Sequence, residues 1–177
     1  ACVDPATGYV YLTEDREDSV LYRFEPSEPG NLSRGGRLQA MKVEGVTDLR
    51  NWTDKSIAVG AVGQVSWIDL DGVEAPEDDL RYQAASKGAS LISRGEGIHM
   101  GGGEAFICST SGGGAGLGQI FKLSLSASGD DDRLALFFES VSHHQFNFGD
   151  NLTVAPNGHL VVCEDQYTAN VDNHLRG

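Results

Sequence analysis

Apolar residues recur along the chain in short runs that are broken by polar, glycine-rich turns. Runs of this length, rich in Val, Leu, Ile, Phe and Tyr, predict β-strands. They lie at residues 9–13, 20–26, 37–43, 66–71, 91–94, 104–108, 119–125, 134–140 and 159–163. One stretch, residues 77–88, instead predicts a helix that Gly88 stops. The pattern therefore predicts an all-β fold with a single short helix.

Three of the runs repeat one another: GYVYLTED at 8–15, GEAFICST at 103–110 and GHLVVCED at 158–165. Each has a leading glycine, an apolar centre and a polar or acidic end, and the first two continue through a turn into a second strand. Repeated antiparallel units of this size indicate a β-propeller. We predict a partial β-propeller, about three to four antiparallel blades of a larger wheel. The three repeated strands are expected to lie innermost, side by side around the axis.

The two ends of the chain bear on domain organisation. The first residues enter the strand-and-turn pattern at once, and the last ones stop without a closing element. We expect residues 1–177 to be an internal fragment of a single β-propeller domain, truncated at both ends. A fragment of this kind is expected to have little enzyme activity when it is made alone.

Charge and composition exclude several classes of protein. The net charge of −13 argues against nucleic acid as a partner, because such binding needs clustered Lys and Arg. It permits divalent cations. No stretch approaches the roughly 18 consecutive apolar residues of a membrane span. Three distant cysteines form neither a disulfide framework nor a CxxC zinc site.

Acidic residues gather where the repeated strands end. If equivalent strand ends converge on the channel of a propeller, their carboxylates face one another and repel unless a cation joins them. Oxygen ligands in that number suit calcium or magnesium, or ferric iron where further ligands complete the site. The candidate metal ligands are Glu14, Asp15, Glu96, Asp150, Asn151, Glu164 and Asp165. The alternative for each acidic pair is a solvated turn.

The stretch SRGEG adds a cationic group to this acidic set. Arg94 and Glu96 are two apart and so lie on the same side of an extended strand. Arg forks onto phosphate oxygens and a carboxylate can hold a metal, so the pair suits a phosphate ester. The alternative is a surface ion pair. His143 and His144 are interpreted as a surface loop, residues 111–118 as a hairpin loop, and Cys163 as a small buried residue on the side of its strand opposite Glu164.

The motifs GYVYLTED, LYRF, GGRLQAM, SRGEG, CSTSGG with GQIF, DNLTVAPNG, VVCED and NHLRG occur in this order along the chain. Together they resemble the PhoX-type alkaline phosphatases and their wider propeller family. The resemblance implies a bacterial, exported propeller, periplasmic or extracellular, that acts as a monomer. It also implies calcium and iron in the central channel and the hydrolysis of small phosphomonoesters.

Matched motif by motif, the resemblance places Glu14, Glu96, Glu164 and Asp165 on metal-ligand positions and Arg94 on a phosphate-contacting one. Arg94 and Glu96 are thus the candidate catalytic residues. The family's iron site also uses an upstream cysteine, to which Cys2 does not match well. GDN stands where the family usually has PDN, around Asp150 and Asn151. The alternatives are a calcium-stabilised propeller that only binds a partner, and a lactonase-type propeller.

Overall fold

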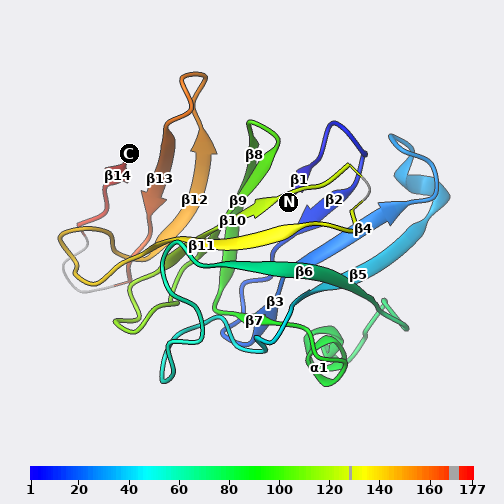
Figure 1. Ribbon diagram of the computed structural model, residues 1–177, viewed down its shortest axis with the longest axis horizontal. Coiled ribbons are helices and arrows are strands. Elements are labelled where there is room, and N and C mark those ends of the chain that lie inside the picture. Colours follow the sequence, from blue (N-terminus) through cyan, green and yellow to red (C-terminus); the bar gives the residue numbers. More distant parts are fainter. Residues whose placement is uncertain (128, 168–171) are drawn as a thin grey trace.

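The computed structural model describes residues 1–127, 129–167 and 172–177, and it is built almost entirely of antiparallel strands. Figure 1 shows three strand units side by side, with the short helix at the edge of the first. The first unit contains β1 (Cys2–Val3), β2 (Val10–Leu12), β4 (Tyr22–Pro26), β5 (Gly36–Val43) and β6 (Val62–Asp69). The second contains β8 (Gly95–Gly101), β9 (Glu104–Ser109), β10 (Gln119–Ser124) and β11 (Arg133–Glu139). The third contains β12 (Gly149–Val154), β13 (Leu160–Glu164) and β14 (Leu175–Arg176).

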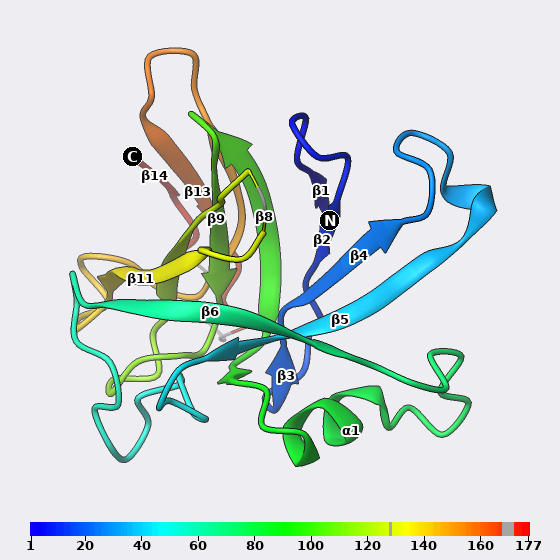
Figure 2. The same ribbon diagram turned by 45° about the vertical axis from the view of Figure 1, so that its right-hand side comes forward.

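The first two units are joined into one large sheet by β6. This long strand pairs with β5 through residues 65–69 and with β11 through residues 62–64. The sheet therefore runs β1-β2-β4-β5-β6-β11-β10-β9-β8, and it curls until β1 packs against β8. Figure 2 shows β6 crossing between the two units. The all-β prediction is confirmed, and the antiparallel sheet is nearly closed on itself.

The remaining elements are short. The predicted helix is present as α1 (Leu80–Ser86), and Gly88 follows it at a φ of 93°, a value that glycine adopts without strain. Two small strands, β3 (Ser19–Val20) and β7 (Leu91–Ile92), pair with each other, and a 3₁₀ turn spans Leu32–Arg34. Within the described residues, no helix is long and apolar enough to cross a membrane.

The three repeated strands occupy equivalent places, but they are not innermost. Each is the second strand of its unit: β2 lies between β1 and β4, β9 between β8 and β10, and β13 between β12 and β14. The strands that lie next to one another across units are the first ones, since β1 packs against β8 and β8 against β12. The prediction of the inner position was wrong because β8 and β12 carry glycine and polar residues that weaken the apolar signal of a strand.

Neighbouring units bury their apolar faces against each other. A large cluster joins the first two units and includes Tyr11, Met41, Ile107, Phe121 and Leu134, all almost fully buried. A second cluster joins the second and third units through residues such as Cys108, Phe146, Leu152 and Val162. No unit could bury such a face alone, which is the packing logic of repeated blades.

A buried ion pair ties β4 of the first unit to the loop before β11. The guanidinium of Arg23 lies 3.5 Å from Asp132 through Nη1 and Oδ2, and both side chains are almost fully buried. The indole of Trp67 donates a hydrogen bond of 2.9 Å to the same carboxylate and stacks 4.4 Å from the guanidinium. The network links β4 and β6 of the first unit to the residue that precedes β11, where the two halves of the sheet meet.

Candidate functional site

Arg94 is the centre of the candidate site, and it lies between β7 and β8. Its Nε donates a hydrogen bond of 2.8 Å to Asp15 Oδ1, and its Nη2 lies 3.6 Å from Glu96 Oε1. Asp15 follows β2, so two segments far apart in sequence meet here. Their backbones are joined as well, because the amide of Gly95 donates to the carbonyl of Glu14 at 3.0 Å. The structure thus brings together three of the residues singled out from the sequence.

Two further carboxylates extend this group. Burial, a hydrogen bond with Asp15 and the charge of Asp150 together raise the pKa of Glu96 to about 7. Burial also raises the pKa of Asp150, and the negative charges of Asp165 and Asp15 add to that effect. Asp15 and Glu96 thus contact the Arg94 guanidinium, Asp150 is close enough for its charge to act on Glu96, and Asp165 is close enough to act on Asp150; we call these five residues the Arg94 cluster. In contrast, the hydrogen bond from Arg94 holds the pKa of Asp15 below its usual value.

A close approach of two strands places Asp150 beside Glu96. A Cβ atom at Gly97 of β8 would lie 2.7 Å from the Cα of Asn151 and 2.7 Å from the carbonyl oxygen of Asp150. Only glycine fits there without moving β12, so the sequence Glu96-Gly97 sets the separation of the two strands. The side chain of Asn151 itself accepts a hydrogen bond from the amide of Leu152 at 2.9 Å, which gives it a role in the local backbone.

The glutamates of the two acidic pairs are held elsewhere. Glu14 accepts a hydrogen bond of 2.7 Å from the Tyr22 hydroxyl and forms an ion pair of 3.2 Å with Arg81 of α1. Glu164 has a fully buried side chain that pairs with Arg176 at 2.8 Å. Among the described contacts, neither glutamate side chain touches Glu96, so the convergence of residues 14, 96 and 164 on one metal cluster stays a prediction. Of the two aspartates, Asp15 lies beside Glu96, whereas the charge of Asp165 acts on Asp150.

Side chains alternate between the two faces of β13, and this decides which of Cys163 and Glu164 is buried. Cys163 was expected to be buried with Glu164 on the other side of the strand; Cys163 is exposed and Glu164 is buried. Alternation therefore holds, but with the two faces exchanged. Although burial disfavours the charged form, hydrogen bonds from Arg176 and His174 hold the pKa of Glu164 below its usual value. Of the residues that hold these glutamates, Arg81 was not singled out from the sequence, and His174 and Arg176 occurred there within the motif NHLRG, with no role assigned.

Two other features behave as the sequence suggested. Residues 111–118 form the loop that joins the antiparallel strands β9 and β10. His143 and His144 lie exposed in a turn, where they border a polar pocket of about 450 Å³ together with His174 and Arg176.

Tyr167, which is exposed, is a further neighbour of the Arg94 cluster, because its hydrogen bond with Asp165 raises the pKa of the phenol.

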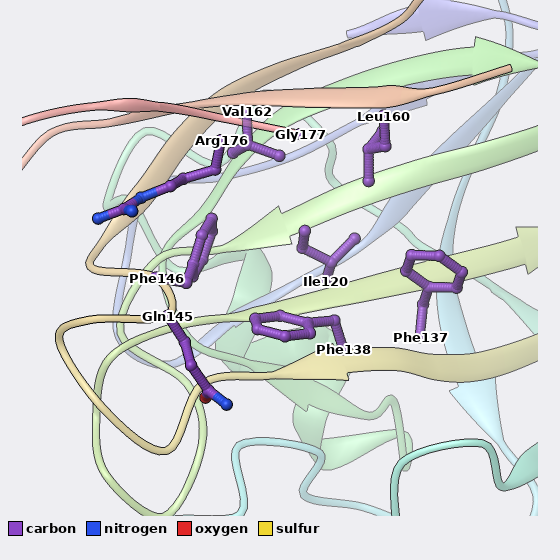
Figure 3. Close-up of a pocket in the computed structure, with 9 residues that line it drawn as sticks. All are labelled: Ile120, Phe137, Phe138, Gln145, Phe146, Leu160, Val162, Arg176 and Gly177. Atoms are coloured by element: carbon purple, nitrogen blue, oxygen red, sulfur yellow. The ribbon is translucent and has the colours of Figure 1, made fainter. Parts of the chain in front are cut away.

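An apolar cavity lies apart from these charged groups, between the second and third units. It has a volume of about 200 Å³ and is lined from β10, β11 and β13 and from the segment before β12. Figure 3 shows Phe137, Phe138 and Phe146 around Ile120, whereas the guanidinium of Arg176 points away from them. A wall of this kind offers no group for acid–base or metal chemistry, so the Arg94 cluster is the better candidate for a functional site.

Comparison with known proteins identifies the family. The family model described as alkaline phosphatase PhoX matches residues 1–177, the whole chain. The chain belongs to the PhoX alkaline phosphatase family. Its fold is similar to that of Pseudomonas fluorescens PhoX in complex with vanadate, a transition state analogue, with a TM-score of 0.67 and 17% sequence identity. The match covers 94% of this chain and 39% of that chain. No curated protein gives a significant match.

Membership of the PhoX family raises the question of which residues could hold a metal, and the Arg94 cluster is the acidic group to consider. Four carboxylates in one region supply hard oxygen atoms, and their mutual repulsion is what a bound cation relieves. Oxygen donors of this kind suit a hard cation, of which calcium is one. Within the described residues, however, no three His, Cys, Asp or Glu side chains are already arranged as a metal site. Burial also raises the pKa of the Cys2 thiol to about 11, which disfavours the thiolate that would bind iron.

Proposed function

We propose that the chain carries the phosphate-binding and calcium-binding residues of a PhoX-type alkaline phosphatase that hydrolyses small phosphomonoesters. The observation that supports this most is the position of the Arg94 guanidinium among the carboxylates of Asp15, Glu96 and Asp150. An arginine forks onto two phosphate oxygens, and carboxylates beside it can hold the cation that a phosphate ester also contacts. The family membership and the fold both agree with this assignment.

In this proposal each residue has a defined task. Arg94 leaves its 2.8 Å contact with Asp15 and binds the phosphate, so it is the residue that touches the substrate. Glu96 and Asp150, with Asp15 and Asp165, would hold calcium, which when bound would supply positive charge to polarise the phosphoryl oxygens. Glu96 stands beside both Arg94 and Asp150 and so couples the phosphate contact to the calcium site.

The other candidate ligands have a weaker structural basis. Glu14, Glu164 and Asn151 stay predictions as metal ligands, because their side chains already have partners other than the Arg94 cluster. Iron also stays a prediction, since no His or Cys of the described chain completes a metal-binding group with the carboxylates. A periplasmic or extracellular location and a monomeric state complete the proposal, on the basis of the family.

Because residues 1–177 alone are expected to have little activity, the experiment is hydrolysis of p-nitrophenyl phosphate with calcium by the full-length protein that contains them, comparing the wild type with Arg94→Ala and Arg94→Lys. We expect a loss of at least about a hundredfold for Arg94→Ala and a partial recovery for Arg94→Lys, since lysine keeps the charge but loses the fork. Arg133→Ala is the matched control, because Arg133 forms an exposed ion pair with Asp131 at 2.9 Å. Calcium binding without any Arg94-dependent turnover would instead favour a propeller that only binds a partner.

A further inference from the structure

Two residues other than glycine adopt the left-handed backbone conformation directly before a strand of the candidate site. Arg94 has a φ of 49° before β8, and Phe148 has a φ of 53° before β12. Each is followed by a glycine and then by an acidic residue of the Arg94 cluster, Glu96 or Asp150. Residues other than glycine are uncommon in this conformation, and such backbone strain gathers at functional sites.

The strands that follow these residues are irregular at the same place. From Gly95 to Ile98, three steps along β8 match two steps along β9. From Gly149 to Leu152, three steps along β12 match two steps along β13. Each first strand therefore carries one extra residue, a β-bulge, which re-aims the side chains within it. The acidic residue of each strand lies inside this stretch.

Hydrogen bonds fix both left-handed residues through equivalent neighbours. The amide of Arg94 donates to the carbonyl of Arg16 at 2.8 Å, and the amide of Phe148 donates to the carbonyl of Leu117 at 2.9 Å. Arg16 and Leu117 lie in the loops that follow β2 and β9, the second strands of the preceding units. The carbonyls of the left-handed residues accept hydrogen bonds from the residues that follow the second strands of their own units, Thr110 at 3.0 Å and Asp165 at 2.9 Å.

The glycine-rich loop 111–118 is shaped to hold the start of β12. A Cβ atom at Gly118 would lie 2.9 Å from the ring of Phe146, and a Cβ atom at Gly149 would lie 2.0 Å from the same ring. The ring therefore packs closely against both the end of the loop and the first residue of β12. The hydroxyl of Thr110, just before the loop, donates a hydrogen bond of 2.7 Å to the carbonyl of Gly149.

We propose that the loop after the second strand of one unit aims the acidic residue at the start of the next unit, through the left-handed residue that it holds. The loop after β2 acts in this way on Glu96 through the backbone of Arg94, and loop 111–118 acts on Asp150 through Phe148. Phe148 is thus a positioning residue, and its task is its backbone conformation. This inference rests on the proposed function, because it takes Glu96 and Asp150 as residues that hold calcium.

The test compares Phe148→Gly with Phe148→Val in the full-length protein, by calcium calorimetry below the melting temperatures of both variants. Both substitutions remove the ring, but glycine adopts a positive φ freely and a β-branched residue does not. Phe148→Val should bind calcium about fivefold to tenfold more weakly than the wild type, and Phe148→Gly should stay within about twofold. Phe148→Asn should resemble Phe148→Gly, since asparagine tolerates this conformation. Equal affinities in the glycine and valine variants would overturn the inference.

Phe106 is the matched control position. It is half-buried like Phe148, but it lies within β9, is paired on both sides and does not have a positive φ. Here valine should give a higher melting temperature than glycine, because glycine weakens the interior of a strand. At position 148 the order should reverse. A higher melting temperature for Phe148→Val than for Phe148→Gly would contradict the role assigned to the backbone.

The loop itself is tested by Gly118→Ala, with Gly114→Ala as the control in the same loop. Gly118 has a φ of 117° and its Cβ would meet Phe146, whereas the nearest atom to a Cβ at Gly114 is 3.7 Å away. Only Gly118→Ala should weaken calcium binding, by about fivefold, because it shifts the loop that holds Phe148. Equal calcium affinities in the two variants would show that the loop does not aim Asp150.

The proposed function and this inference fail in distinguishable ways. If the wild-type protein binds no calcium, the metal part of the proposed function fails, and a metal-free crystal structure of Phe148→Val decides the inference. We expect the hydrogen bond from the amide of position 148 to the carbonyl of Leu117 to be lost and the carboxylate of Asp150 to be displaced, while the Asp15–Arg94 contact is kept. Asp150 in its wild-type position would refute the positioning role.

Discussion

Arg94 Nε and Asp15 Oδ1 lie 2.8 Å apart although 79 residues separate them in the sequence. The contact holds the cationic group of the Arg94 cluster against one of its own carboxylates. A phosphate that binds Arg94 must displace Asp15, and a cation that binds Asp15 releases Arg94. Binding of the anion and binding of the cation are therefore expected to help each other.

Asp15→Asn tests this competition. Without calcium, the variant should bind inorganic phosphate about threefold more tightly, a modest gain because the ion pair is half exposed and screened by solvent. With calcium it should bind the cation more weakly, since one charged ligand is lost. Calorimetric titrations with phosphate and with calcium measure both effects. Asp69→Asn, which removes an exposed partner of Arg37, is the control, and an equal effect there would contradict the assignment.

Gly97→Ala tests the close approach of β8 and β12. The added Cβ would meet backbone atoms of residues 150 and 151 at 2.7 Å, so one strand has to shift. We expect a loss of about 1–3 kcal/mol in the free energy of unfolding, together with weaker calcium binding. Urea denaturation measures the first quantity. Gly114→Ala is the control, because the nearest atom to its Cβ is 3.7 Å away; a similar loss in both variants would refute the steric argument.

Asp132→Ala tests the junction between the two sheet halves. It leaves the buried guanidinium of Arg23 with its hydrogen bonds to Gln39 but without its charged partner, and this should lower the free energy of unfolding by about 3–5 kcal/mol. The neighbouring substitution Asp131→Ala removes an exposed ion pair with Arg133 and an exposed hydrogen bond from Gln64, and it should cost no more than about 1 kcal/mol. Chemical denaturation of both variants gives the comparison, and equal costs would show that the buried pair does not fix the junction.

A pH dependence is expected from Asp48. Hydrogen bonds from Arg50 Nη2 at 2.7 Å and Nε at 2.9 Å hold the pKa of this carboxyl below its usual value in the folded chain. Its contribution to stability is therefore present above the unfolded pKa and is lost as the pH falls through the folded pKa. Asp48→Asn should be less stable than the wild type at pH 7, and the difference should shrink as the pH falls below 4. A difference that grows on acidification would contradict this sign.

The sequence was sufficient to predict the strand units, because repeated apolar runs such as 8–15 and 158–165 mark strands whose side chains are buried. It was not sufficient for β8, whose residues Gly95, Gly97 and Gly101 dilute the apolar pattern. The order of strands within each unit was therefore misjudged by one place.

The candidate site shows the same limit at the level of single residues. Alternation predicts that the two members of each acidic pair point apart, but it does not say which of them faces the Arg94 cluster. The outcome depends on Arg81, 67 residues from Glu14, and on Arg176, 12 residues from Glu164. Partners at such separations follow from the packing of α1 and β14, and no local pattern reports them.

The most direct test of the phosphatase assignment is a crystal structure of the chain grown with calcium and vanadate. The account predicts vanadate oxygens in contact with the Arg94 guanidinium, and calcium bound by carboxylate oxygens of Glu96 and Asp150, with the Asp15–Arg94 contact broken. Vanadate bound away from Arg94, or calcium bound by Glu14 and Glu164 in place of Glu96 and Asp150, would contradict it.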